Sequence, residues 1–145
     1  MTEKRILLVE DDGGDAALIL RALDQSSTTS LVCAVRDGEE AFDFLLQPDE
    51  QGRRRPPPDL ILLDWNLPGS GGAAVLEKLR SEPLTRWLPV VVITGGGSRS
   101  GHADAYRLGA NSYVVKPTDA EHFSEIIENV VRYWLDVNEP PPWVN

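Results

Sequence analysis

Five short runs of apolar residues stand out along the chain, and each ends at a polar residue or a turn former. They cover residues 5–9, 31–35, 60–63, 90–93 and 113–115. A continuous apolar run of this length is typical of a strand that is buried on both faces, as in a parallel sheet. The clearest run, residues 60–63, leads straight into Asp64 and then into Pro68 and Gly69. We therefore expect five buried strands, with Asp64 at the end of one of them.

Between these runs, apolar residues recur at the spacing of a helix. We predict helices at about residues 15–25, 39–46, 73–80, 102–108 and 119–137. A capping box formed by Thr118 and Glu121 opens the last helix. The apolar arc of that helix is about 200° wide, which is more than one packing face needs. Either the proline-rich tail, residues 138–145 with Trp143, or a second subunit could cover the excess.

The alternation of strands and helices predicts an α/β fold with one doubly wound, five-stranded parallel sheet and right-handed crossovers. A chain of 145 residues is long enough for one domain with a sizeable core. We expect this domain to span residues 1–137 and the tail to span residues 138–145, without an output domain.

Composition narrows the range of partners. The net charge of −9 argues against nucleic acid, because phosphate backbones are bound by an excess of Lys and Arg. No apolar run approaches the roughly 20 residues that span a bilayer, so we expect no membrane contact. The opening apolar run is too short for a signal peptide, and the single cysteine, Cys33, cannot form an internal disulfide. We therefore expect a cytoplasmic protein.

Residues 47–58 form a long polar connection that ends in three prolines. Such a segment is neither a helix nor a central strand. It contains Arg53, Arg54 and Arg55, which could be a docking patch or simply part of a solvated loop. Because the segment precedes a strand, we expect it at the amino edge of the sheet, away from Asp64.

Polar side chains that could carry chemistry follow four of the five strands. They are Glu10 and Asp11 after the first strand, Asp64 after the third, Thr94 after the fourth and Lys116 after the fifth. Parallel strands bring their carboxyl ends to one edge, where ligands bind in open α/β sheets. A cap of the following helix could explain one acid of the run from Glu10 to Asp12, but three acids are harder to explain in this way. We expect the five side chains to share one cleft.

This set of side chains is suited to phosphoryl transfer. Three carboxylates are hard oxygen ligands of the kind that Mg²⁺ prefers. Aspartate is also a known covalent acceptor of phosphate, which makes Asp64 the candidate nucleophile. The Lys116 amine and the Thr94 hydroxyl could contact the phosphoryl oxygens.

Four motifs in this chain are similar to those of response-regulator receiver domains in two-component signalling. They are Val9-Glu10-Asp11-Asp12, Asp64-Trp65-Asn66-Leu67-Pro68, Ile93-Thr94-Gly95 and Tyr113-Val114-Val115-Lys116-Pro117. The resemblance covers about residues 4–137. It implies the CheY-like strand order 2-1-3-4-5. CheY is itself a standard example of a doubly wound fold with this order.

The resemblance also implies a metal site and a phosphorylation site. Asp64 is the implied phosphoacceptor. The family pattern uses only the first two acids of a run such as Glu10-Asp11-Asp12, so Asp12 is the implied start of the following helix. Asp11 and Asp64 are the implied direct ligands of Mg²⁺, Glu10 acts partly through water, and the backbone carbonyl of Asn66 is a further ligand. Lys116 is the implied phosphoryl-binding residue, and the Lys116–Pro117 peptide bond is expected to be cis.

A conformational switch is implied in the same way. On phosphorylation the Thr94 hydroxyl moves toward the phosphate and the Tyr113 ring turns inward, so that the face near the fourth helix and the fifth strand changes.

One departure from the family pattern is the pair Gly71-Gly72, which stands where Asp-Gly is common and predicts a looser turn. The run Gly95-Gly96-Gly97 predicts a flexible loop after Thr94.

The long loop and the aromatic segment at residues 133–135 resemble a subgroup of single-domain regulators that serve phytochrome-type histidine kinases. Members of that subgroup dimerise through the last helix region, so the implied partners are a sensor histidine kinase and a second copy of the chain. The implied role is that of a phosphoacceptor with self-catalysed phosphotransfer and dephosphorylation rather than of an enzyme.

Two other functions remain open at the level of the sequence. A Mg²⁺-dependent phosphatase resembling the haloacid dehalogenases could use Asp64 as its nucleophile, but it needs a second acid at position 66, where this chain has Asn66. A flavodoxin-like binding module could use residues 95–97 to cradle a phosphate, although the nearby acidic residues would repel it.

Overall fold

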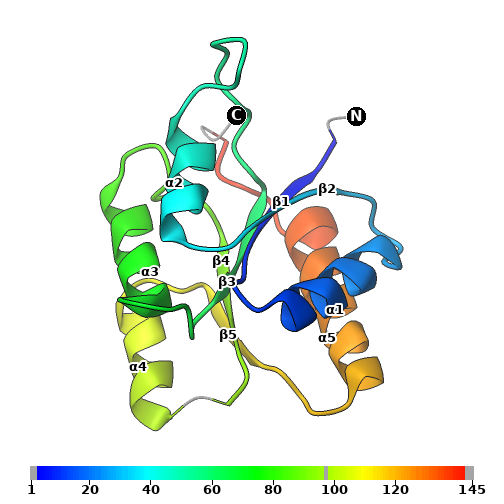
Figure 1. The fold of residues 1–145 in the computed structure, drawn as a ribbon. Coiled ribbons are helices and arrows are strands. Elements are labelled where there is room, and N and C mark those ends of the chain that lie inside the picture. The colour runs from blue at the N-terminus through cyan, green and yellow to red at the C-terminus, as the bar shows by residue number, and fades with distance from the viewer. Residues whose placement is uncertain (1–2, 97, 143–145) are drawn as a thin grey trace.

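The computed structural model describes residues 3–96 and 98–142, so Gly97 and Trp143 lie outside the described residues. Five parallel strands form one sheet in the order β2-β1-β3-β4-β5 (Figure 1). The strands are β1 (Arg5–Val9), β2 (Leu31–Val35), β3 (Leu60–Asp64), β4 (Val90–Thr94) and β5 (Ser112–Val115). This is the predicted α/β fold with the predicted strand order, which is therefore confirmed.

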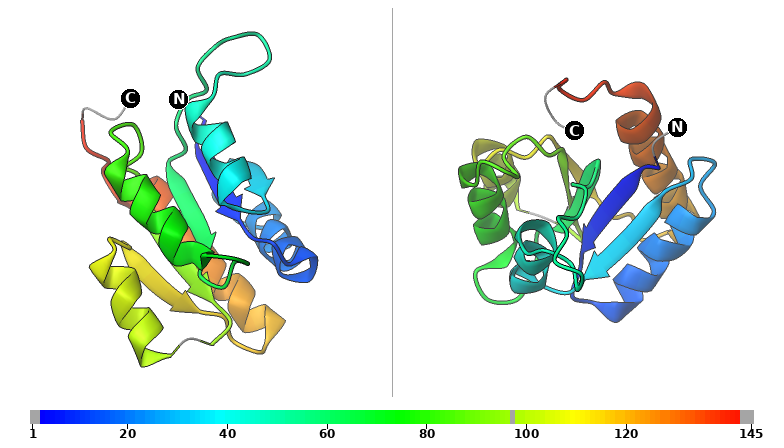
Figure 2. Two further views of the ribbon diagram at one scale, coloured as in Figure 1. Left: turned by 60° about the vertical axis from the view of Figure 1, so that its left-hand side comes forward. Right: turned by 90° about the horizontal axis from the view of Figure 1, so that it is seen from above.

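Helices cover both faces of the sheet. They are α1 (Gly13–Asp24), α2 (Gly38–Leu46), α3 (Gly71–Ser81), α4 (Arg99–Arg107) and α5 (Ala120–Arg132), which continues into the π-helical segment η1 (Tyr133–Val137). Figures 1 and 2 show α1 and α5 on one face, and α2, α3 and α4 on the other. Both faces of the central strands are thus shielded from water, which is why these strands are apolar except at their ends.

The central strand β3 divides its side chains between two core clusters. Leu60 and Leu62 belong to the cluster with α1 and α5, whereas Ile61 and Leu63 belong to the cluster with α2 and α3. Successive side chains of a strand point to opposite faces, so a strand between two helix layers needs an apolar residue at every position. Asp64 is the last residue of β3 and is held by this rigid strand.

Two details of the last helix differ from the predictions. Asp119, and not Thr118, is the N-cap of α5, since its carboxylate accepts a hydrogen bond from the backbone N–H of Glu121. Aspartate caps a helix as well as threonine does, and it stands one residue closer to the helix. The helix also widens at its end, where the N–H of Asn138 donates to the carbonyl of Tyr133.

The wide apolar arc of the last helix is only partly buried. Phe123, Ile127 and Leu135 pack into the core, but Tyr133 is 48% exposed and Val137 is 59% exposed. Asn138, Pro140 and Pro141 of the tail line a small cavity together with Trp87 and Trp134. An apolar area on the last helix segment therefore remains open to solvent.

The loop before β3 lies at the amino edge of the sheet, as predicted (Figure 1). Arg55 has a structural role there, because its guanidinium donates to the carbonyl of Gln47 at 2.9 Å and stacks over the Phe44 ring. Arg53 pairs with Asp49 on the exposed surface at 3.7 Å. At least one of the three arginines thus stabilises the end of α2. Among the described residues, no helix is long and apolar enough to cross a bilayer.

Candidate functional site

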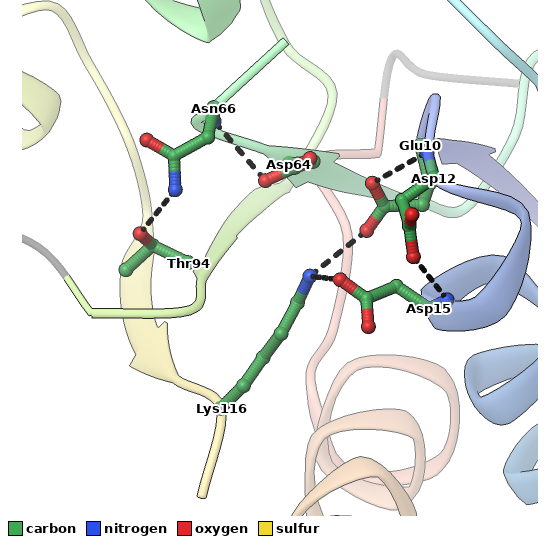
Figure 3. Close-up of polar contacts among 7 residues, drawn as sticks. All are labelled: Glu10, Asp12, Asp15, Asp64, Asn66, Thr94 and Lys116. Atoms are coloured by element: carbon green, nitrogen blue, oxygen red, sulfur yellow. Dashed lines mark hydrogen bonds and ion pairs between the residues drawn. The ribbon is translucent and has the colours of Figure 1, made fainter. Parts of the chain in front are cut away.

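The sheet brings its polar strand ends together at one edge, as Figure 3 shows. Glu10 follows β1, Asp64 ends β3, Thr94 ends β4 and Lys116 follows β5. Glu10, Asp64 and Thr94 are all buried, with 3%, 6% and 0% of their surface exposed. Buried polar side chains are uncommon without partners, so this edge differs from the rest of the core.

Three carboxylates converge at this edge. Glu10, Asp11 and Asp64 each offer an oxygen, and these oxygens lie within 4.8 Å of one another. Burial and the nearby Asp64 together raise the pKa of Glu10 to about 7, although Lys116 opposes the shift. Such a cluster is unfavourable without a cation, and its donors are the hard oxygens that divalent ions prefer. The residues present therefore fit a divalent metal ion.

Lys116 lies across the acidic cluster. Its ammonium donates hydrogen bonds to Glu10 at 3.0 Å and to Asp15 at 2.7 Å. Burial alone would lower the pKa of Lys116, but the hydrogen bonds to these two carboxylates outweigh it and the pKa is raised. Lys116 is thus held as a cation beside Asp64 by two acids.

Asp15 is a site residue that the sequence interpretation missed. It stands in the first turn of α1, where an acid is explained by the helix dipole alone. Its pairing with Lys116 spans 101 positions and depends on how α1 packs against the sheet. The only signal in the sequence was an acid one turn after the acidic run.

Asp12 has the role that was predicted for it. Its side chain accepts a hydrogen bond from the N–H of Asp15 at 2.8 Å and so caps α1. Asp12 does not belong to the carboxylate cluster of Glu10, Asp11 and Asp64. The third acid of the run therefore starts a helix, and the first two belong to the site.

Asn66 connects Asp64 with Thr94. Its backbone N–H donates to Oδ1 of Asp64 at 3.0 Å, and its side-chain Nδ2 donates to Oγ1 of Thr94 at 3.0 Å (Figure 3). The resemblance had implied a role only for the backbone carbonyl of this residue. The side-chain contact was not predicted, because it depends on the geometry of the loop after β3.

The glycine pair that departs from the family pattern makes a close turn. Gly71 has a φ of +73°, which L side chains rarely adopt. A Cβ at Gly72 would lie only 2.8 Å from the Asp64 carbonyl oxygen and 2.8 Å from the Trp65 Cα. α3 therefore starts in direct contact with the backbone of the Asp64 loop, and the looser turn stays a prediction.

Tyr113 lies on the α4 side of the sheet, apart from the acidic cluster. It pairs with Val92 in the sheet, and its ring stacks on His102 of α4 at 4.3 Å between centroids. Its hydroxyl is buried and has no hydrogen-bond partner among the described residues. His102 is thus a neighbour of the expected switch residue that the sequence did not indicate.

The expectation of a cis peptide bond before Pro117 is wrong for this structure. The described residues contain no cis peptide bond. The trans form is intrinsically favoured for an X–Pro bond by about 0.5–1 kcal/mol. The N–H of Lys116 donates to the carbonyl of Thr94 at 2.7 Å, so Lys116 is positioned by the end of the sheet.

Known proteins resemble this chain over most of its length. The family model "Response regulator receiver domain" matches residues 6–128. The probable methanogenesis regulatory protein FilR2 of Methanothrix harundinacea is 37% identical over 136 residues, which cover 94% of this chain and 86% of FilR2.

Two solved structures are similar over nearly the whole chain. The phosphorylated cyanobacterial phytochrome response regulator RcpA is 36% identical with a TM-score of 0.87, covering 97% of this chain and 99% of RcpA. The Mn²⁺-bound response regulator Rcp1, a protein of Synechocystis sp., is 32% identical with a TM-score of 0.83, covering 95% of this chain and 99% of Rcp1. The chain therefore belongs to the response regulator receiver family of two-component signalling.

Proposed function

We propose that Asp64 accepts a phosphoryl group from the phosphohistidine of a sensor histidine kinase, in a reaction that needs Mg²⁺. The observation that carries this proposal is the carboxylate cluster formed by the buried Glu10 and Asp64 and the exposed Asp11, with Lys116 held beside it. The resulting aspartyl phosphate signals to a partner through a change in protein contacts. As a receiver domain, the protein acts in the cytoplasm, where its kinase exposes the phosphohistidine.

The residues divide the reaction between them. An oxygen of Asp64 attacks phosphorus, the new P–O bond forms, and the electron pair of the broken P–N bond returns to the imidazole of the kinase. A divalent ion held by the carboxylates would neutralise charge on the phosphoryl oxygens. We assign Glu10, Asp11, Asp64 and the carbonyl of Asn66 to the metal, and Lys116 and Thr94 to the phosphoryl group. Thr94 and Tyr113 are the proposed switch residues.

The phosphatase alternative lacks a necessary group. A general acid would have to stand at position 66, and Asn66 instead donates its amide to Thr94. Asn66 has no ionisable proton to give to a leaving group. A phosphoacceptor with self-catalysed transfer and dephosphorylation needs no such acid, which supports the receiver function.

The test uses a small phosphodonor in place of the kinase. The protein is incubated with Mg²⁺ and acetyl phosphate, and its intact mass is measured. We expect one added phosphate, and we expect that chelation of Mg²⁺ prevents the addition. A protein that gains no mass with Mg²⁺ present would contradict the proposed function.

Metal binding is expected to depend on pH because of Glu10. The pKa of this carboxyl is raised to about 7, so the metal-free protein binds a proton there below neutral pH. A cation must displace that proton. The apparent affinity for Mg²⁺ is therefore expected to fall by about tenfold from pH 8 to pH 6.

Trp65, which directly follows Asp64, gives the readout for this experiment through its fluorescence during Mg²⁺ titrations. A Glu10→Gln variant should lose most of the pH dependence, and Trp65→Phe should lose the signal. An affinity that stays constant between these pH values would show that Glu10 does not titrate at the site.

In the metal-free protein, the contribution of Glu10 to the free energy of unfolding is lost as pH rises from 4.5 toward 7.

We also propose that the upstream partner is a phytochrome-type histidine kinase. Support comes from the similarity to RcpA, a phytochrome response regulator. A bacteriophytochrome kinase labelled with phosphate is expected to transfer it faster than a kinase that senses another stimulus. Equal transfer from both kinases would remove this assignment and leave the phosphoacceptor function in place.

Homodimer formation through the last helix segment is a further part of the proposal. Tyr133 and Val137 are exposed there, next to the apolar face that packs on the sheet. A Val137→Glu variant is expected to sediment as a monomer if the wild-type protein is a dimer. Leu84→Glu, at a site that is 50% exposed, is the matched control and should not change the oligomeric state. A wild-type monomer with and without phosphate would rule out the dimer.

A further inference from the structure

Asn66 makes two hydrogen bonds that connect the acceptor carboxylate with the hydroxyl of Thr94. Its N–H holds Oδ1 of Asp64, and its carboxamide Nδ2 donates to Oγ1 of Thr94, each at 3.0 Å. Asn66 itself lies in an exposed loop, whereas Thr94 is fully buried. An exposed side chain thus reaches down to a buried polar group at the end of β4 (Figure 3).

The hydrogen bonds of the Thr94 hydroxyl are only half complete. A hydroxyl has one proton to donate and two lone pairs that accept. Thr94 Oγ1 accepts from Asn66, and within residues 3–96 and 98–142 it donates to no other residue. Because Asn66 is the donor in this bond, the proton of Thr94 must point elsewhere. Asp64 lies at the neighbouring end of β3, where it pairs with Ile93, the residue before Thr94.

We propose that the carboxamide of Asn66 is a positioning residue that orients the Thr94 hydroxyl, so that its proton is directed at a phosphoryl group on Asp64. This inference rests on the proposed function, because it needs Asp64 as the phosphoacceptor. It assigns the Asn66 side chain a role that is separate from the metal-binding carbonyl of the same residue. The phosphoryl oxygen completes the hydrogen bonding of Thr94 and receives a preoriented donor.

A double-mutant cycle tests this role. Asn66→Leu has a similar branched shape and removes the amide donor, and Thr94→Val removes the hydroxyl in a shape close to threonine. The initial rate of phosphate addition from acetyl phosphate with Mg²⁺ is measured by intact mass for the wild-type protein, both single variants and the double variant. The Mg²⁺ affinity of each protein is measured by Trp65 fluorescence.

We expect Asn66→Leu to slow phosphorylation roughly tenfold, as the loss of one well-oriented hydrogen bond does. In the Thr94→Val background the same substitution should change the rate by less than about twofold, because no hydroxyl is left to orient. The Mg²⁺ affinity should stay the same, since the backbone carbonyl of residue 66 is retained. A purely structural role would not show this dependence on Thr94.

Several results would overturn the inference. They are an unchanged or faster rate in Asn66→Leu, an equal slowing in the Thr94→Val background, or a loss of Mg²⁺ affinity that accounts for the slowing. Asn66→Ala serves as the second variant, and both should fold, because the side chain that they replace is exposed. Absence of phosphate addition to the wild-type protein would instead mean that the proposed function itself has failed.

Discussion

An Asp64→Asn variant is expected to take up no phosphoryl group from acetyl phosphate. The amide of asparagine is a poor nucleophile, and it carries no negative charge to bind a cation beside Glu10 and Asp11. Asp64 is 6% exposed at the end of a strand that is buried at all five positions, so its carboxylate is held in place at the edge of the sheet. Intact mass after incubation with Mg²⁺ and acetyl phosphate measures the result.

Asp12→Asn is the matched control for this variant. It makes the same chemical change in a neighbouring acid that caps α1, and asparagine is an equally good cap. We expect this control to gain one phosphate at a rate close to that of the wild-type protein. Phosphate addition to Asp64→Asn would place the phosphoacceptor elsewhere in the chain. If neither variant gains phosphate, the substitutions have damaged the whole acidic region.

Replacement of Lys116 by Met is expected to slow phosphorylation by roughly 100-fold, as the loss of one preorganised charged donor does. Methionine keeps a similar length and apolar stem but removes the cation that Glu10 and Asp15 hold beside Asp64. The pKa of Glu10 should rise further, because Lys116 is the group that now lowers it. Trp65 fluorescence during a Mg²⁺ titration measures the apparent Mg²⁺ affinity of this variant at neutral pH.

Lys78→Met is the control for a lost lysine charge. Lys78 lies on α3, where its ammonium stacks over the Phe42 ring, away from the acidic cluster. The control should phosphorylate at the wild-type rate. If both lysine variants slow the reaction equally, the effect of Lys116 comes from the net charge of the protein and not from its place beside Asp64.

The prediction of the fold from the sequence was successful because its strongest signals are local. The five strands lie where the apolar runs lie, and β1 and β2 have the predicted bounds. Burial on both faces requires an apolar residue at every position, and such a run has few alternative structures. The helix ends were predicted less accurately. Asp119 caps α5 where Thr118 was predicted to do so, because two adjacent polar residues can both serve as a cap.

The sequence by itself also determined which side chains meet at the site. Glu10 and Lys116 directly follow strands, and Asp64 and Thr94 are the last residues of strands. Parallel strands must present their carboxyl ends at the same edge. This placement follows from topology and needs no knowledge of side-chain angles. It is the reason why four residues up to 106 positions apart could be assigned to one cleft.

Only the tertiary structure decided how these side chains pair. The bond from Lys116 to Asp15 depends on the packing of α1 against the sheet, and the bond from Asn66 to Thr94 depends on the path of one loop. Distances of 2.7 and 3.0 Å require the positions of two elements to be set to within a fraction of an ångström. The pattern of residue types along a chain specifies which elements neighbour each other, and side-chain packing between those elements sets the hydrogen bonds.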